Sequence, residues 1–284
     1  MTPPALVFFH RGKSWYLPYV LRQAYRFNKA NRIILLTDAR DRLLERFCEI
    51  HLLGDYSESA DRLVKVFRNF SPNPPDYELF CLQRWLILRD FCAAHRIERA
   101  VQLDSDVMVY SDLSAAGRDF ADRDVVLTGF QCPASTYINS QDALANFCDF
   151  VLWSYRENVS FLESSYRGWL AKGLTGGISD MHFLHEFVAR GKWKFGDNSV
   201  VTNGSRFDEC ANASDGYAFT GERKDFQFIA GQPYGARLDT GERVRFHTIH
   251  FQGLSKKFIP GLSTRRDLYY YFLALSSRLR RLRG

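Results

Sequence analysis

The sequence lacks the features that would assign it to several familiar classes of protein. Its six cysteines form no C-x-x-C pair and have no zinc-like spacing, which excludes a dithiol redox motif or a zinc module and predicts reduced thiols. No run approaches the roughly 18 apolar residues that a membrane-spanning helix needs. The first residues show no basic segment followed by a long apolar stretch, as a secretory signal would, so we expect a soluble cytoplasmic protein.

The chain also lacks internal repeats and low-complexity linkers, and its excess of positive charge is confined to one end. Of its 284 residues, 46% are hydrophobic and 15% aromatic, which is enough to bury a sizeable core. The formal charge is +6, but residues 262–284 alone hold six arginines and one aspartate, so the rest is close to neutral. A protein that coats nucleic acid would spread its basic residues, and we expect no nucleic-acid partner. The predicted organisation is one domain over residues 1–260 and a basic, aromatic helical tail over 261–284.

Short apolar runs alternate with amphipathic segments in the first half of the chain. Strands are expected at residues 5–9, 32–37 and 49–53, with helices at 14–28, capped by Ser14, and at 39–47. Such alternation is typical of a mostly parallel central sheet with helices on both faces. Further along, we expect strands at 124–128 and 243–250 and helices at 77–95, 139–153, 164–172 and 179–190. Residues 191–241 are expected to be Gly-rich and irregular, with short strands only around 199–202 and 226–229.

The most informative stretch, residues 99–113, reads R-A-V-Q-L-D-S-D-V-M-V-Y-S-D-L. Asp104 and Asp106 interrupt two apolar runs, and burying unpaired carboxylates costs several kcal/mol each, very roughly. A divalent cation such as Mg²⁺ or Mn²⁺ would compensate their charge, since hard oxygen ligands suit these ions. A capped turn or an ion pair is the alternative. A second D-x-D triplet, at 122–124, has no such context and is interpreted as a solvated turn.

A second motif follows far downstream, where residues 250–258 read H-F-Q-G-L-S-K-K-F at the end of a strand-like run. The two motifs, D-x-D after one strand and H-F-x-G-x-x-K-x-aromatic after another, together resemble the GT-A glycosyltransferases, most closely family 8 and its relatives. The resemblance extends in order from Leu6 to Phe258 and implies a single GT-A (Rossmann-like) α/β domain. Those enzymes use a D-x-D and a late histidine to hold a divalent ion against the diphosphate of a sugar nucleotide.

The resemblance implies a metal site formed by Asp104, Asp106 and His250. An imidazole ligand suits Mn²⁺ better than Mg²⁺, so Mn²⁺ is the expected ion and a nucleotide sugar the co-substrate. His247, expected earlier on the same face of the same strand, is a rival ligand. A histidine packed in the core is the plain alternative for His250.

Gly253 and Lys256, which both follow this histidine in the sequence, are expected to contact the diphosphate. Gly253 would let the backbone approach a phosphate closely. Lys256 would neutralise charge on the departing diphosphate and so take part in catalysis, with Lys257 as its rival.

The end of the first strand is expected to lie near a nucleoside, because open α/β sheets bind ligands beyond the carboxyl ends of their strands. The candidates there are Phe9, His10, Arg11 and Asp38. Asp38 would alternatively cap a helix that starts after it.

Donor contacts are also expected from the helix before the D-x-D and from the D-x-D itself. Residues 83–85 (Q-R-W) match a region that touches the donor in relatives, and Arg84 is the candidate for a diphosphate or sugar contact. A solvated arginine is the alternative. Ser105 is a further candidate for donor binding.

A Gly-rich turn, L-T-G-G-I-S-D-M at residues 174–181, precedes the helix expected at 179–190. The resemblance favours sugar recognition and a catalytic role for Asp180, with Gly176 and Gly177 shaping the pocket. The alternative is an ordinary turn with an aspartate that favours the helix dipole. Family 8 usually has more Asp and Asn in its sugar-facing region, so the sugar and the stereochemical course stay open.

These motifs predict a metal-dependent glycosyltransferase that moves a sugar from a nucleotide diphosphate donor, UDP-linked by expectation, to a glycan or lipid-linked acceptor. The resemblance implies a retaining course, whereas an inverting enzyme would need a carboxylate base such as Asp180. One alternative is a nucleotidyltransferase that makes a sugar nucleotide, although the turn at 10–13 has a single glycine. The other is a non-catalytic protein that binds membrane surfaces.

The tail combines an apolar run with arginines. Residues 268–275 read L-Y-Y-Y-F-L-A-L and are too short to span a bilayer. The basic residues that follow are Arg278, Arg280, Arg281 and Arg283. The tail would either bind an anionic membrane, placing the enzyme on the inner leaflet near a lipid-linked acceptor, or pack on the domain as a helix.

Overall fold

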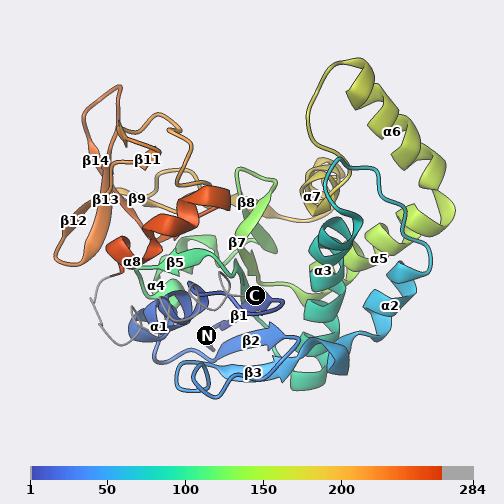
Figure 1. Ribbon diagram of the computed structural model, residues 1–284, viewed down its shortest axis with the longest axis horizontal. Helices are drawn as coiled ribbons and strands as arrows, with labels where there is room; N and C mark the ends of the chain where they lie inside the picture. Colours follow the sequence, from blue (N-terminus) through green and yellow to red (C-terminus); the bar gives the residue numbers. More distant parts are fainter. Residues whose placement is uncertain (1, 264–284) are drawn as a thin grey trace, which may run out of the picture.

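The computed structural model describes residues 2–263, which form a mixed sheet with helices on both faces (Figure 1). Three strand pairs at one side of the sheet are parallel, and so is the pair at the opposite edge, whereas β7 runs antiparallel to both of its neighbours. In spatial order the strands are β3 (Glu49–Leu52), β2 (Ile33–Thr37), β1 (Ala5–His10), β4 (Ala100–Asp104), β7 (Cys132–Ile138), β6 (Val125–Thr128) and β8 (Phe195–Asp197). The expected α/β fold with a mostly parallel sheet is confirmed.

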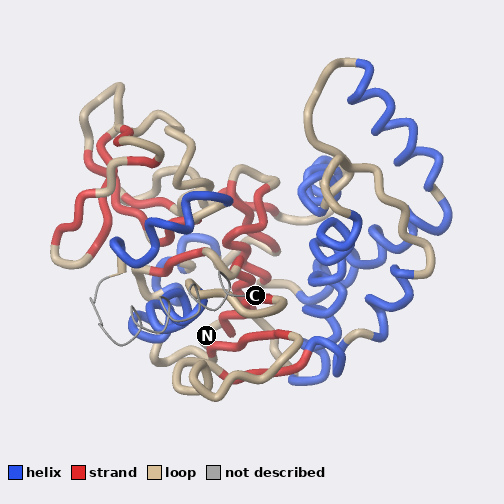
Figure 2. The backbone as a smooth tube through the Cα atoms, viewed as in Figure 1, coloured by secondary structure: helices blue, strands red, loops and turns tan. Residues whose placement is uncertain are grey.

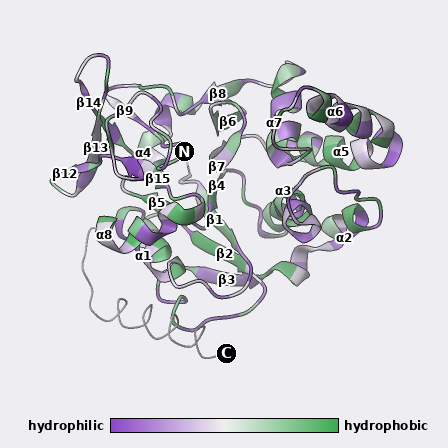
Figure 3. Ribbon diagram, turned by 45° about the horizontal axis from the view of Figure 1, so that its top comes forward, coloured by the Kyte–Doolittle hydropathy of each residue, from purple (hydrophilic) through white to green (hydrophobic). Residues whose placement is uncertain are grey.

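The two faces of this sheet are covered differently, because alternate side chains of β1 enter two separate cores. Leu6 and Phe8 belong to one core, and Val7 and Phe9 to the other. The first face is covered by α1 (Leu17–Phe27), α4 (Leu113–Ala116) and α8 (Ile259–Leu262). The second is covered by α2 (Glu58–Val64), α3 (Pro75–His95), α5 (Gln141–Glu157) and α7 (Asp180–Ala189), while α6 (Val159–Ala171) projects beyond α5. Strand β2 is drawn mainly in the hydrophobic colour (Figure 3), as expected for a strand buried between both layers.

The later part of the chain builds short strands beside the first face, visible as the second group of strands in Figure 2. One small sheet has the order β12 (Gln227–Ile229), β13 (Gln232–Ala236), β14 (Arg243–Phe246) and β9 (Ser205–Arg206), and β10 (Phe219–Thr220) pairs with β11 (Arg223–Lys224). A two-stranded antiparallel ribbon joins β5 (Val107–Val109) to β15 (Thr248–His250). Short 3₁₀ helices lie at η1 (Leu53–Tyr56), η2 (Arg118–Phe120) and η3 (Gly253–Phe258).

Two expected helix features are wrong. Residues 39–47 form consecutive turns, with Leu44 N–H bonded to Asp41 O and Phe47 N–H to Leu44 O, and not a helix. Within that range only Leu44 is buried, so a short, highly charged segment has too few apolar anchors to stabilise a helix. Helix α1 begins at Leu17 after Tyr16 with no side-chain cap, so Ser14 is not its cap.

The strand expected at 243–250 is two strands, because the chain changes partners at His247. Strand β14 pairs with β13 and β9, whereas β15 pairs with β5. Between them, His247 N–H donates to Arg206 O and His247 O accepts from Tyr110 N–H. The stretch 191–241, expected to be irregular, also contains more strands than its Gly-rich sequence indicated, including β8 and β13.

The predicted tail lies mostly outside the described residues. The division at residue 260, the C-terminal helix and its membrane or packing role therefore stay predictions. Helix α8 spans residue 260 and buries Ile259 and Leu262. Within residues 2–263, no helix combines the length and the apolar character needed to cross a bilayer.

The connection between α6 and α7 packs tightly on the loop that precedes α3. Ile178 N–H donates to Phe70 O over 2.9 Å. A Cβ on Gly177 would lie 2.5 Å from Phe70 O and 2.5 Å from Ser71 Cα, both backbone atoms. Only glycine permits this approach, so the packing of two loops explains Gly177 without any ligand.

Replacing Gly177 by alanine should therefore lower the free energy of unfolding by about 1–3 kcal/mol, the usual cost of overpacking. Gly168→Ala is the matched control, since it lies within α6 with no atom within 4 Å of the added Cβ. It should raise the free energy of unfolding by about 0.5–1 kcal/mol. Urea denaturation of both variants measures the contrast, and equal effects would show that the Gly177 contact is not limiting.

Candidate functional site

The two sequence motifs meet at the carboxyl end of β4. Asp104 ends β4, and a two-residue turn through Ser105 and Asp106 leads into β5. In the β5–β15 ribbon His250 lies opposite Val107, and Phe251 N–H donates to Asp106 O over 3.0 Å. Antiparallel pairing therefore brings the late histidine beside the D-x-D, although the two are far apart in sequence.

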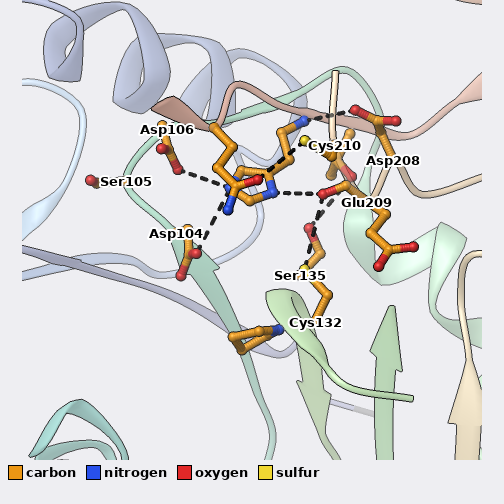
Figure 4. A network of polar contacts seen from close by, with 12 residues as sticks. Asp104, Ser105, Asp106, Cys132, Ser135, Asp208, Glu209 and Cys210 are labelled. Carbon is orange, nitrogen blue, oxygen red and sulfur yellow. Dashed lines mark hydrogen bonds and ion pairs between the residues drawn. The ribbon is translucent and has the colours of Figure 1, made fainter. Parts of the chain in front are cut away.

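Three potential metal-ligand atoms converge there. One ligand atom each of Asp104, Asp106 and His250 lies within 4.8 Å of the other two, and among the described residues no other group of three such side chains does so. The Nε2 atom of His250 lies 3.4 Å from Asp106 Oδ1 and 3.9 Å from Asp104 Oδ2. Figure 4 shows both carboxylates directed toward the centre of this polar network. Two carboxylate oxygens and an imidazole nitrogen form a donor set that suits Mn²⁺.

The charges at this centre strongly influence one another. Burial raises the pKa of Asp106, but His250 and Lys256 lower it, and the net pKa lies well below its usual range. Burial lowers the pKa of His250, but Asp106 raises it, and the net pKa lies well above the ordinary histidine value. Lys256 Nζ lies 2.7 Å from Asp106 Oδ2. The protonation of Asp106 and of His250 thus depends on the charges of the neighbouring side chains.

The structure separates each candidate from its rival. The expectation that His247 shares a strand face with His250 is wrong, because His247 lies at the bend between β14 and β15, and its Nδ1 lies 2.9 Å from Ser111 Oγ. His247 is therefore not brought to the carboxylates. Lys257 pairs with exposed Glu222, whereas Lys256 faces the D-x-D.

Arg84 links the D-x-D to α7. Its Nη1 lies 2.5 Å from Asp104 Oδ1, and its Nη2 lies 2.6 Å from Asp180 Oδ2. Its side chain is 11% exposed, so the alternative of a solvated arginine is wrong. Gln102 supports the same pair, since its Nε2 donates to Asp104 Oδ1 over 3.1 Å.

Asp180 is the first residue of α7 and is buried. Its Oδ2 accepts hydrogen bonds from Arg84 and from Trp85 Nε1, at 2.6 and 3.1 Å. Its Oδ1 has no hydrogen-bond partner among residues 2–263. The carboxylate is thus directed toward α3. Ser179 holds the N-cap position, and Asp180 lies in the first turn of α7, where an aspartate favours the helix dipole, so that alternative stays open.

The residues expected near a nucleoside are grouped at the end of β1. His10 Nδ1 lies 3.0 Å from Ser105 Oγ, and burial lowers the pKa of His10. Arg11 donates to Gln83 Oε1 over 3.0 Å and lies over the ring of Phe80.

Asp38 directly follows β2, and Phe9 lies near the end of β1. Both carboxylate oxygens of Asp38 accept from Gly12 N–H at 3.0 Å, so this side chain fixes the turn after β1. No helix follows it, and its alternative as a helix cap is wrong. Phe9 is paired with Asp104 in the sheet, and its ring is in the core beneath α3, so only its backbone could approach a nucleoside.

The three candidate glycines have different surroundings. Gly253 has φ +58 and no atom within 4 Å of a built Cβ, so open space adjoins it. Gly176 is exposed at φ +109, beside Trp169, whereas Gly177 is buried against the loop before α3. Only Gly176 and Gly253 are therefore placed where a ligand could reach their backbone.

Sequence reasoning missed a second polar group behind His250. The main-chain oxygen of Glu209 lies 2.7 Å from His250 Nδ1, and Asp208 Oδ2 accepts from His250 N–H over 3.2 Å. Lys224, with no exposed side-chain surface, pairs with Asp208. These residues belong to the irregular stretch, where no motif or periodicity marks them.

The buried, neutral character of His247 predicts a pH dependence of stability. Burial and then Arg245 lower its pKa to about 4, with Asp119 opposing. Since the unfolded side chain titrates near 6.5, the unfolded state binds more protons between these values, and stability falls as pH drops from about 6.5 to about 4. His247→Gln should remove up to about 3 kcal/mol of this loss. Urea unfolding of both proteins at pH 7.5 and 4.5 measures it; a wild-type-minus-variant difference that is the same at both pH values would contradict the assignment.

Comparisons with known proteins add structural neighbours but no sequence relative. No protein-family model matches the sequence, and no curated protein matches it. Mouse xyloside xylosyltransferase 1 is similar over 72% of this chain and 87% of its own, with 12% identity and a TM-score of 0.46. The galactosyltransferase LgtC, solved with donor and acceptor sugar analogues, is similar over 96% of this chain and 95% of its own, with 10% identity and a TM-score of 0.46. The bifunctional glycosyltransferase WbbM is similar over 95% of this chain and 51% of its own, with 10% identity and a TM-score of 0.48.

Proposed function

We propose that this protein is a metal-dependent glycosyltransferase that moves a sugar from a nucleotide diphosphate donor, with UDP as the nucleotide, to a glycan or lipid-linked acceptor. The observation that carries the proposal is the convergence of ligand atoms from Asp104, Asp106 and His250 at the carboxyl end of the sheet. That edge is where open α/β sheets bind nucleotides. The two motifs that supply these residues are the ones that resemble family 8 and its relatives.

The donor set of the site fits a divalent ion that binds together with a diphosphate. Three protein ligands leave coordination positions open for phosphate oxygens, and the imidazole favours Mn²⁺ over Mg²⁺. When bound, such an ion would offset the negative charge that grows on the leaving diphosphate. The residues of the chain that would hold it are Asp104, Asp106 and His250.

Lys256 and Gly253 would bind the diphosphate from the side of η3. The ammonium of Lys256 is already within 2.7 Å of a D-x-D oxygen, so a short side-chain movement would transfer it to a phosphate. As a compact point charge on a flexible stem, lysine suits this task. Open space beside Gly253 leaves room for a phosphate against the backbone.

The pair of Arg84 and Asp180 would form the sugar side of the site. Arg84 is held between Asp104 and Asp180, which fixes its guanidinium next to the metal ligands. Asp180 Oδ1, which has no partner among the described residues, would accept a hydrogen bond from a donor hydroxyl. We favour the retaining course that the resemblance implies; in an inverting enzyme this Oδ1 of Asp180 would instead have to act as the general base.

Asp106→Asn should lower donor turnover at least about 100-fold, because it removes one metal ligand and weakens the hold on Lys256. Release of UDP from a panel of UDP-sugars, with Mn²⁺ and then with EDTA, measures this. Asp122→Asn is the matched control: it changes the other D-x-D triplet, where the side chain is 69% exposed, and should leave turnover unchanged. Full activity in EDTA, or an Asp106→Asn variant as active as the control, would remove the basis for the proposal.

A further inference from the structure

Lys224 is a fully buried cation whose three protons are all accounted for. Its side chain has 0% exposure, and its Nζ lies 2.8 Å from Asp208 Oδ1, 2.6 Å from Asp215 Oδ2 and 2.5 Å from Cys210 O. An ammonium group is stable inside a protein only when such partners replace water. The ammonium group of Lys224 therefore has one acceptor for each of its three protons. None of these three acceptors belongs to Asp104, Asp106 or His250.

These contacts hold a segment that has no regular structure of its own. Residues 208–211 lie outside every strand and helix. Lys224 holds their start through Asp208, their middle through the Cys210 carbonyl and their end through its own N–H, which donates to Ala211 O over 2.8 Å. Lys224 is thus one residue that contacts the start, the middle and the end of this segment, in addition to the bond from Asp208 N–H to Thr248 O.

The same segment holds His250 at three points. Asp208 Oδ2 accepts from His250 N–H over 3.2 Å, and Ala211 N–H donates to His250 O over 2.8 Å. The Glu209 carbonyl lies 2.7 Å from His250 Nδ1, and Figure 4 shows Asp208, Glu209 and Cys210 close together, on the opposite side of the network from Asp104 and Asp106. Because a carbonyl oxygen only accepts, Nδ1 carries a proton, and Nε2 is the nitrogen that faces the carboxylates.

We propose that Lys224 is the positioning residue of the metal site: through the segment 208–211 it fixes the orientation of the His250 ring and aims Nε2 at Asp104 and Asp106. The inference rests on the proposed function only in taking His250 as a metal ligand. Groups that orient a ligating histidine through its second nitrogen control metal affinity, and their loss typically weakens it by about 10- to 100-fold. Lys224 acts one step further out, since it holds the group that makes that hydrogen bond.

Two variants and one control test this role. Lys224→Met keeps the length of the side chain and removes its charge, and Asp208→Asn keeps the shape of the carboxylate while weakening its hold on both Lys224 and His250. Leu63→Ala is the control for a general loss of stability, because Leu63 is fully buried in α2 on the other face of the sheet. The affinity for Mn²⁺ in the presence of UDP is measured from the electron paramagnetic resonance signal of free Mn²⁺. We expect this affinity to fall about 10- to 100-fold in Lys224→Met, and by an amount near the lower end of that range in Asp208→Asn. It should not change in Leu63→Ala at a temperature where all four proteins are folded.

A second readout needs no metal. The Nδ1 proton of His250, identified by its loss in His250→Gln, should give a slowly exchanging proton NMR signal in the unsubstituted protein and in Leu63→Ala. It should broaden or vanish in Lys224→Met. Failure of the unsubstituted protein to bind Mn²⁺ with UDP would refute the proposed function, while the ring proton would still decide the role of Lys224. If Lys224→Met does not fold, Asp208→Asn decides: unchanged Mn²⁺ affinity and an unchanged ring proton would overturn the proposal.

Discussion

Three aspartates that lie close together at the carboxyl end of β4, two of them buried and Asp104 half-buried, are the constraint on which the arrangement of this protein depends. Asp104, Asp106 and Asp180 could not remain charged there without partners, because desolvation of unpaired carboxylates is costly. Arg84 from α3 pairs with two of them, and Lys256 and His250 pair with the third, so that three cationic groups face three carboxylates. The partners come from three separate parts of the chain, so the fold has to bring α3, α7 and the β5–β15 ribbon to the same place.

This balance of charge explains how such a site can stay ordered and still take a donor. The aspartates and their cationic partners are already close to neutral as a group, so a divalent ion alone would add uncompensated positive charge. A diphosphate that arrives with the ion would supply the matching negative charge. Against the effect of burial, His250 and Lys256 lower the pKa of Asp106, and Asp106 raises the pKa of His250.

Sequence patterns identified the parts of the structure that depend on local signals. The apolar runs predicted β1, β2 and β3, the helical spacing predicted α3, and the D-x-D and the late histidine predicted the residues that the structure brings together. What the sequence did not reveal depends on contacts between distant residues. Arg84 was expected to touch a donor, but its partners Asp104 and Asp180 lie 20 and 96 residues away, a pairing that no spacing rule encodes. Lys224 belongs to a segment without periodicity, and only the folded chain shows what it holds.

The proposed function requires a metal ion and a diphosphate to meet at Asp104, Asp106 and His250. A crystal grown with Mn²⁺ and UDP, with diffraction data collected at the manganese absorption edge, tests this requirement without depending on any acceptor. We predict one anomalous peak bounded by Asp104, Asp106 and His250 Nε2, with diphosphate oxygens completing the coordination and Lys256 moved toward them. Bound UDP with no anomalous peak at these three side chains, or with the ion held elsewhere, would contradict it.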